Sequence, residues 1–425
     1  MGTKIAVIGG GSTYTPELID GLTTRAERLP IEELALLDVD QERLDIVGGL
    51  AQRMLDRTGW TGRLVATRDQ ERALDGADFV LIQLRVGGQA ARLIDETLPP
   101  RFGTIGQETT GAGGFAKALR TVPVVLELAE DVRRRAAPGA WIVDFTNPVG
   151  IVTQALLDRG YRAIGLCNVA INLQRRVARQ LGVEPDRVAL EHVGLNHLSW
   201  ERAVRLDGMD VLPRLLESDG VALAREIGLP VSQLRRLQAI PSYYLRYYYR
   251  SDHVLREQRA GHTRAAEVMD IERRLLDLYR DPTLTEKPAL LADRGGAFYS
   301  EAAAQLIASL HDGRGDLQVV DVTNAGALPD LPADAVVEVP ARIDESGAHA
   351  LRLAPLAPAM HDLVVQVKQY EMLAVTAAVS GDRKVALDAL AANPLVGPQV
   401  DVRALLNALL TANEALLPAF FPGHA

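Results

Sequence analysis

The chain has 425 residues, of which 48% are hydrophobic and 24% charged, proportions typical of a globular protein with two or three domains. Its formal net charge of −9 argues against nucleic acid or an anionic membrane as the main partner. No apolar run reaches the ~18 residues of a membrane-spanning helix, and we expect no signal peptide. Because the single cysteine, Cys167, cannot form an internal disulfide, we expect a cytoplasmic protein.

Strands and helices are predicted to alternate through the first half of the chain. Short apolar runs that end in Gly, Asp or Asn-Pro are typical of buried strands. The alternation predicts a parallel sheet with helices on both faces, as in Rossmann-like, doubly wound α/β proteins. The predicted strands cover residues 4–10, 33–40, 78–84, 140–148 and 162–168, and helices are predicted from near residue 16 and at 41–57, 115–135 and 170–181.

The second half of the chain is predicted to be mainly helical. Residues 192–206 are predicted to form a strand or hairpin, and residues 317–324 and 334–343 two antiparallel strands. Helices are expected at residues 232–249, 263–278, 299–310 and over much of 358–419. We therefore expect two intertwined domains, residues 1–170 and a mixed α+β domain of residues 171–425 for substrate binding, catalysis and oligomerisation.

A glycine cluster lies between the first predicted strand and the first predicted helix. Glycines there let backbone amides approach a pyrophosphate at the helix N-terminus, although a simple tight turn is the alternative. The next strand ends in an aspartate, where a carboxylate accepts hydrogen bonds from an adenosine ribose and favours NAD over NADP. Together the two features predict that domain 1–170 binds NAD through Gly9, Gly10, Gly11, Ser12 and Asp38.

Cys167 ends a later strand of the same predicted sheet. A lone buried cysteine usually acts as a small hydrophobic residue, but ligands of open parallel sheets bind beyond the carboxyl ends of the strands. His197 follows in a turn rich in Gly and Asn. A thiolate and an imidazole suit Mn, Fe, Co, Ni or Zn, and such a pair leaves positions for water and substrate oxygens. From the residues alone, this metal site is only suggested.

Several long motifs along the whole chain are specific enough to indicate a family. They include IGGGSTYTPELIDGL, GTIGQETTGAGGF, DFTNPVGI, IGLCNVAIN, VGLNHLSW and LADRGGAFYSEAAAQLI. These motifs resemble those of glycoside hydrolase family four, the NAD- and metal-dependent glycosidases. The resemblance implies that Cys167 and His197 hold a divalent metal, usually Mn²⁺. It also implies hydrolysis of 6-phospho-β-glucosides such as phosphorylated cellobiose.

The resemblance also implies roles in catalysis and substrate binding. Tyr244 resembles the family's catalytic base, although five tyrosines lie between residues 243 and 249 and the residues alone do not distinguish among them. Glu108 resembles the carboxylate that raises the basicity of this tyrosine, a role that requires it to accept a proton. Substrate contacts are implied for Arg92, Asn147, Asn168 and Arg264.

Two positions near the cysteine bear on these assignments. Ala170 stands where the family usually has proline, which leaves the loop after Cys167 less rigid. Asn168 stands where members specific for α-glycosides tend to have an aspartate as general acid. The resemblance therefore favours β-glycosides.

The implied reaction differs from that of ordinary glycosidases, which place two carboxylates beside the scissile bond. NAD⁺ oxidises C3 of the sugar, and the metal polarises the resulting ketone. Tyr244 then removes the C2 proton, the C1–O bond breaks by elimination, and water addition and return of the hydride complete the cycle. Because a phenol has a pKa of ~10, Tyr244 would need cationic neighbours.

Three other functions remain as alternatives. An NAD-dependent 2-hydroxy acid dehydrogenase would share the sheet and the glycine loop, but it would use a His–Asp relay and an arginine without a metal. A non-enzymatic NAD sensor is disfavoured by the intact set of candidate catalytic and metal-binding residues. A family member that acts on unphosphorylated sugars stays open. The expected partners are a phosphorylated β-glucoside and further copies of the chain in a homodimer or homotetramer.

Overall fold

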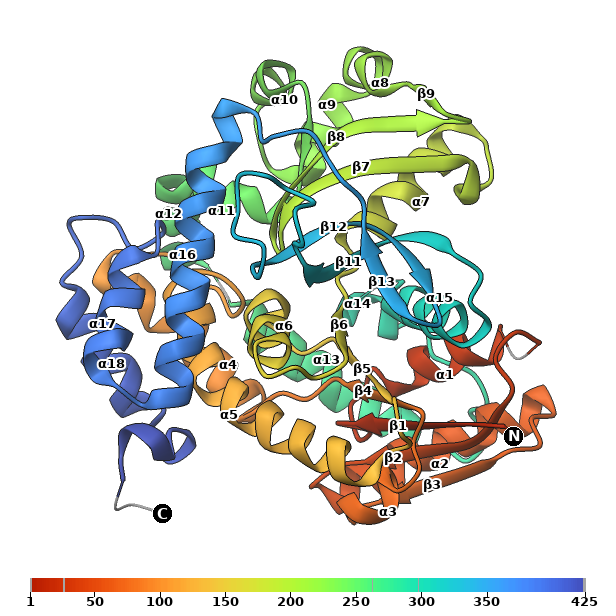
Figure 1. Ribbon diagram of the computed structural model, residues 1–425. Coiled ribbons are helices and arrows are strands. Elements are labelled where there is room, and N and C mark those ends of the chain that lie inside the picture. Colours follow the sequence, from red (N-terminus) through yellow and green to blue (C-terminus); the bar gives the residue numbers. More distant parts are fainter. Residues whose placement is uncertain (1, 26, 262, 297, 423–425) are drawn as a thin grey trace.

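A nine-stranded sheet forms the centre of the structure, a computed structural model that describes residues 2–25, 27–261, 263–296 and 298–422 (Figure 1). Six of its strands are parallel and lie in the order β3, β2, β1, β4, β5, β6. This order is that of a doubly wound dinucleotide-binding fold, so the predicted Rossmann-like α/β class is confirmed. The six strands are β1 (Thr3–Ile8), β2 (Ile31–Leu37), β3 (Arg63–Thr67), β4 (Phe79–Ile82), β5 (Trp141–Asp144) and β6 (Ala163–Gly165).

The helices that follow these strands begin and end at recognisable sequence signals. Asp40 caps α2, because its carboxylate accepts the backbone N–H of Arg43 at 3.1 Å, and Gly59 ends the same helix with a φ of 71°. The sequence prediction missed β3, the short α3 and α4, which begins at the second of two consecutive glycines. The helices of this half are α1 (Thr15–Thr23), α2 (Gln41–Thr58), α3 (Gln70–Leu74), α4 (Gly88–Thr97), η1 (Pro99–Phe102), α5 (Gly111–Arg135), α6 (Val149–Leu157) and α7 (Val169–Leu181).

Three strands from the second half of the chain extend the same sheet. The strand β11 (Asp316–Thr323) runs antiparallel to β6, and β12 (Val336–Asp344) and β13 (Gly347–Ala350) continue the antiparallel pairing. The two predicted antiparallel strands are therefore confirmed. Because one sheet takes strands from both sides of residue 170, the two halves interlock, and a domain boundary at that residue stays a prediction.

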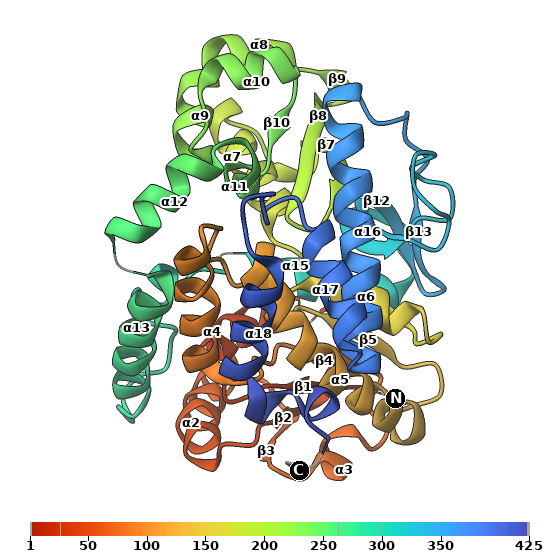
Figure 2. The same cartoon turned by 90° about the vertical axis from the view of Figure 1, so that its left-hand side faces the viewer.

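A smaller antiparallel sheet lies at the top of Figure 1. The predicted hairpin forms its two long strands, and α13 packs against α2 and α4 of the first half (Figure 2). No helix in the described part of the chain is long and apolar enough to cross a membrane. The remaining elements are η2 (Pro185–Arg187), β7 (Val188–Leu195), β8 (Leu198–Leu206), β9 (Met209–Asp210), α8 (Leu212–Ser218), α9 (Gly220–Ile227), α10 (Val231–Leu237), β10 (Ile240–Pro241), η3 (Tyr243–Leu245), α11 (Arg246–Tyr249), α12 (Ser251–Ala260), α13 (Arg264–Tyr279), α14 (Leu291–Arg294), α15 (Tyr299–Asp312), α16 (Pro358–Ser380), α17 (Arg383–Ala392), α18 (Val402–Ala412), η4 (Glu414–Leu416) and η5 (Pro418–Phe420).

The prediction of one helix over residues 232–249 is wrong. The helix α10 ends at Leu237, and Gln238 follows it with a left-handed φ of 50°. Pro241, which has no N–H to donate inside a helix, lies in the short strand β10. The tyrosine-rich segment therefore begins a new turn, η3, that is oriented independently of α10.

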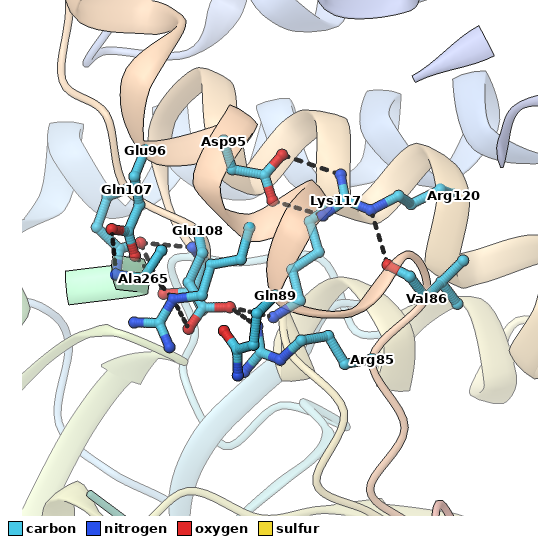
Figure 3. Close-up of polar contacts among 12 residues, drawn as sticks. Arg85, Val86, Gln89, Asp95, Glu96, Gln107, Glu108, Lys117, Arg120 and Ala265 are labelled. Atoms are coloured by element: carbon cyan, nitrogen blue, oxygen red, sulfur yellow. Dashed lines mark hydrogen bonds and ion pairs between the residues drawn. The ribbon is translucent and has the colours of Figure 1, made fainter. Parts of the chain in front are cut away.

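A buried ion pair joins α4 to α5 and should be essential for stability (Figure 3). Arg120 donates to Asp95 at 2.9 Å and to the carbonyl of Val86 at 3.1 Å, and both charged side chains are fully buried. Asp95→Ala would leave the guanidinium buried without its partner. We expect a loss of about 3–5 kcal/mol in the free energy of unfolding, measured by chemical denaturation.

The control is Asp270→Ala, because Asp270 pairs with Arg273, whose side chain is 71% exposed. Breaking this pair should cost less than about 1 kcal/mol. Equal stability of the two variants would contradict the role assigned to the buried pair.

Candidate active site

A cleft of about 1660 Å³ opens at the carboxyl ends of the parallel strands. This volume exceeds the roughly 300–1,000 Å³ of ordinary small-molecule pockets and leaves room for a dinucleotide beside a sugar. Gly9, Ser12 and Asp38 line the cleft from the Rossmann-like half. Tyr244 and Arg264 line it from the second half, so both halves of the chain form its walls.

The glycine loop has the close backbone packing that a dinucleotide site requires. Gly9 has a φ of 85°, and a Cβ there would lie 2.9 Å from the carbonyl oxygen of Gln83. The backbone N–H of Gly11 donates to Asp38 Oδ2 at 2.9 Å, and a Cβ on Gly11 would lie equally close to this oxygen. The loop leads directly into α1, whose N-terminus favours an anion. These residues therefore fit a pyrophosphate and its adenosine ribose.

Cys167 follows β6, and His197 lies in the turn between β7 and β8 with a left-handed φ of 62°. Their exposed fractions are only 5% and 3%, and neither belongs to the residues that line the cleft. Burial raises the pKa of the Cys167 thiol, and burial lowers the pKa of His197 to about 4. The imidazole is therefore neutral, which is the form that binds metals.

The donor atoms of Cys167 and His197 fit a metal. The Nδ1 atom of His197 is buried and has no hydrogen-bond partner among the described residues. The described residues contain no group of three or more His, Cys, Asp or Glu side chains that could hold an ion. A metal bound by Cys167 and His197 would therefore take its remaining ligands from substrate and water.

Tyr244 lines the cleft and packs against His197. Its ring stacks on the His197 ring with centroids 3.7 Å apart, and burial followed by the nearby Cys167 raises the pKa of its phenol. Tyr248 instead contacts Thr110, with 2.9 Å between the two hydroxyl oxygens. The packing against His197 thus distinguishes Tyr244 within the tyrosine-rich segment.

Glu108 is surrounded by three cations (Figure 3). Lys117 donates to its Oε2 at 2.6 Å, Arg92 Nε lies 3.2 Å from its Oε1, and Arg85 forms a further ion pair with Oε2. Burial opposes ionisation, but the three cations together hold the pKa of Glu108 well below its usual range. This geometry favours a permanently ionised carboxylate and does not favour Glu108 as the acceptor of a proton from tyrosine.

The four predicted substrate residues occupy different environments. Arg92 is buried and donates to Glu96 at 2.7 Å, whereas Arg264 is 45% exposed and donates to the carbonyl of Asp293 at 2.6 Å. Both arginines line the cleft. Asn147 also lines it, and its Oδ1 is buried without a hydrogen-bond partner among the described residues. Asn168 begins α7 directly after Cys167 and does not line the cleft.

Sequence reasoning missed several residues of the cleft wall. Tyr299 lies with its hydroxyl 3.8 Å from the Cys167 sulfur. Lys117 is buried within α5. Arg294 is the last residue of α14 and lies next to the glycine loop. Arg294 stands directly before two glycines, and Lys117 stands in an otherwise apolar stretch of its helix. Lys117 pairs with Glu108 from the loop before its own helix, and Arg294 contacts Thr13 from a distant part of the chain. Neither contact follows from the local sequence pattern.

Comparisons with known proteins identify the family of the chain. The model of the family 4 glycosyl hydrolases matches residues 4–183, and the model of their C-terminal domain matches residues 192–396. The chain is 41% identical to a probable 6-phospho-beta-glucosidase of Bacillus subtilis, over 99% of this chain and 98% of that protein. It is 28% identical to the maltose-6'-phosphate glucosidase of the same species, over 98% and 96% of the two chains.

A solved structure extends the similarity to three dimensions. The 6-phospho-beta glucosidase from Thermotoga maritima, determined with manganese, NAD⁺ and glucose-6-phosphate, is 36% identical and has a TM-score of 0.91. The similarity covers 97% of this chain and 99% of that one. With family models that match nearly the whole sequence and a shared fold, the chain belongs to glycosyl hydrolase family 4.

Proposed function

We propose that this protein hydrolyses 6-phospho-β-glucosides and requires NAD and a divalent metal, Mn²⁺. The observation that carries the proposal is the packing of Tyr244 against His197 and close to Cys167, at the wall of a cleft that also holds the glycine loop. Similarity over the full length to a probable 6-phospho-β-glucosidase supports the substrate class. The Thermotoga relative, solved with both cofactors and glucose 6-phosphate, supports the requirement for them.

The chain's own residues would hold the ligands and move one proton. The loop of Gly9 to Gly11 with Asp38 would hold the dinucleotide, and Cys167 with His197 would hold the metal. When bound, these groups supply oxidation at C3 of the sugar and Lewis-acid activation beside it. Once deprotonated, the hydroxyl oxygen of Tyr244 takes the proton from C2, after which the C1–O bond breaks by elimination.

The electrostatics of the inner cleft support this route over the usual one. An ordinary glycosidase needs one carboxyl group that is protonated and able to donate to the leaving oxygen. Glu96 and Glu108 both line the cleft, but Arg92 lies 2.7 Å from the first and 3.2 Å from the second. Glu108 in addition has a lowered pKa, so it cannot serve as an acid near neutral pH.

The two candidate arginines would contribute differently to recognition of the phosphate. Arg92 is already paired with Glu96 and Glu108, so less of its charge is available to a phosphate. Among the described residues, the ion pairs of Arg264 are limited to the exposed carboxylate of Glu267 at 2.9 Å, so Arg264 is the better partner for a phosphate dianion. Asn168 in place of an aspartate favours the β-anomer.

We also propose that the enzyme works in the cytoplasm as a homodimer or homotetramer. A metal site that depends on a thiolate needs a reducing compartment, which supports the location. The family resemblance supports this oligomeric state. The mass of the protein in solution is the measurement that checks it.

The substrate class can be tested with a matched pair of chromogenic substrates. With NAD⁺ and Mn²⁺ present, p-nitrophenyl β-glucoside 6-phosphate should be cleaved with a kcat/KM at least about tenfold higher than that of the unphosphorylated glycoside. Each charge-assisted hydrogen bond to the phosphate contributes roughly 1.5–3 kcal/mol. Equal turnover of the two would reject the phosphate requirement, and a preference for the α-anomer would reject the role given to Asn168.

The metal site can be tested by replacing its thiol. Cys167→Ser should bind Mn²⁺ at least about tenfold more weakly in a titration followed by electron paramagnetic resonance, because a hydroxyl is not deprotonated by the metal as a thiol is. Chelation should abolish the activity of the wild-type protein, and Mn²⁺ with a thiol reductant should restore it. Full activity of the variant in the presence of a chelator would contradict the assignment.

A further inference from the structure

Arg294 is a partly buried cation from the second half of the chain that contacts the glycine loop. Its Nε donates to Thr13 Oγ1 at 2.7 Å, and its Nη2 lies 3.5 Å from Ser12 Oγ. The side chain is 17% exposed and lines the cleft together with Gly9 and Ser12. Thr13 lies just before Tyr14, the N-cap of α1, and a dinucleotide pyrophosphate binds at this helix N-terminus in the fold.

Neighbouring residues fix the orientation of this guanidinium. Glu272 of α13 accepts from Arg294 Nη2 at 3.1 Å and from Gln89 of α4 at 3.0 Å. The guanidinium carbon lies 5.7 Å from the centre of the Tyr14 ring. The remaining nitrogen, Nη1, makes no hydrogen bond to any described residue, so it stays available as a donor.

The residue before Arg294 connects the same segment to the proposed sugar-phosphate site. Arg264 donates through Nη2 to the carbonyl oxygen of Asp293 at 2.6 Å. Two glycines with φ of 88° and 93°, Gly295 and Gly296, follow directly, and the Tyr14 hydroxyl donates to the carbonyl of Gly296 at 2.6 Å. One short segment therefore contacts both the glycine loop and the arginine that we assign to the phosphate.

We propose that Arg294 binds the pyrophosphate of the dinucleotide and that the Asp293–Arg294 pair couples cofactor binding to sugar-phosphate binding. The coupling rests on the proposed function, which places a phosphorylated sugar at Arg264. Each ligand orders the segment of residues 293–296. The second ligand therefore binds to a segment that is already ordered, and its binding loses less conformational entropy. The coupling must be reciprocal: each ligand raises the affinity for the other by the same factor.

The pyrophosphate contact is tested by calorimetric titration of the full-length protein with adenosine, ADP and NAD⁺. Arg294→Gln should weaken ADP and NAD⁺ at least about tenfold, because a charge-assisted hydrogen bond is lost. Adenosine has no phosphate, so its affinity should stay unchanged. Equal weakening of all three ligands would show a structural effect on the pocket and would overturn the contact, as would unchanged binding of ADP.

The coupling is tested by titrating NAD⁺ with and without saturating glucose 6-phosphate. Glucose 6-phosphate should tighten NAD⁺ binding to the wild-type protein at least about fivefold, the lower end of typical coupling between sites. The coupling ratio is the affinity for NAD⁺ with glucose 6-phosphate divided by the affinity without it. This ratio should fall to one in both Arg294→Gln and Arg264→Gln. The control, Arg274→Gln, removes a 58% exposed arginine of α13 that does not line the cleft, and it should retain the wild-type ratio.

A second variant covers the case in which Arg294→Gln does not fold. Arg294→Lys keeps the charge, so ADP should bind better than to the glutamine variant, but one ammonium cannot contact the loop, Glu272 and a phosphate together. The coupling ratio should still fall to one, and a wild-type ratio in this variant would overturn the proposal. The ADP and adenosine titrations need no turnover, so they decide the pyrophosphate contact even if the proposed activity fails. Absence of glucose 6-phosphate binding to the wild-type protein would contradict the proposed substrate class and the coupling together.

Discussion

The ionised carboxylate of Glu108, held among three cations, is the constraint on which the inner cleft depends. Removing such a charge from water costs several kcal/mol unless cations surround it. Its partners come from three places: Arg85 follows β4, Arg92 lies on α4 and Lys117 on α5. The loop after β4 and both helices must therefore converge on one point. This convergence forms part of the wall of the cleft that Tyr244 also lines.

The remaining parts of the site come from the second half of the chain and close over the Rossmann-like sheet. The hairpin β7–β8 brings in His197, the turn η3 brings in Tyr244, and α14 brings Arg294 to the glycine loop. Tyr244 cannot act as a base by itself, because its raised pKa keeps the phenol protonated at neutral pH unless a cation lies beside it. Cofactor, metal and sugar thus depend on contacts between the two halves.

The sequence predicted the local signals of this fold better than its long-range contacts. The glycine loop with Asp38, the alternating strands and the antiparallel pair agree with the structure, because each depends on short patterns of apolar and turn residues. The helix predicted across Pro241 is wrong, because the pattern of apolar residues continues through the segment while the backbone leaves the helix after Leu237. Tyr244 could not be separated from its neighbours without the family resemblance, and Lys117 and Arg294 gave no signal, because the sequence does not show that each forms an ion pair at the cleft wall.

The central claim is that one tyrosine removes the proton at C2 of the sugar and that the glycosidic bond breaks by elimination. Turnover of a 6-phospho-β-glucoside in D₂O tests this most directly. If Tyr244 removes the C2 proton and solvent replaces it, nuclear magnetic resonance of the glucose 6-phosphate formed will show deuterium at C2, and Tyr244→Phe will lose both cleavage and exchange. A product with only protium at C2, released at the full rate, would contradict the account even though the bond had been hydrolysed.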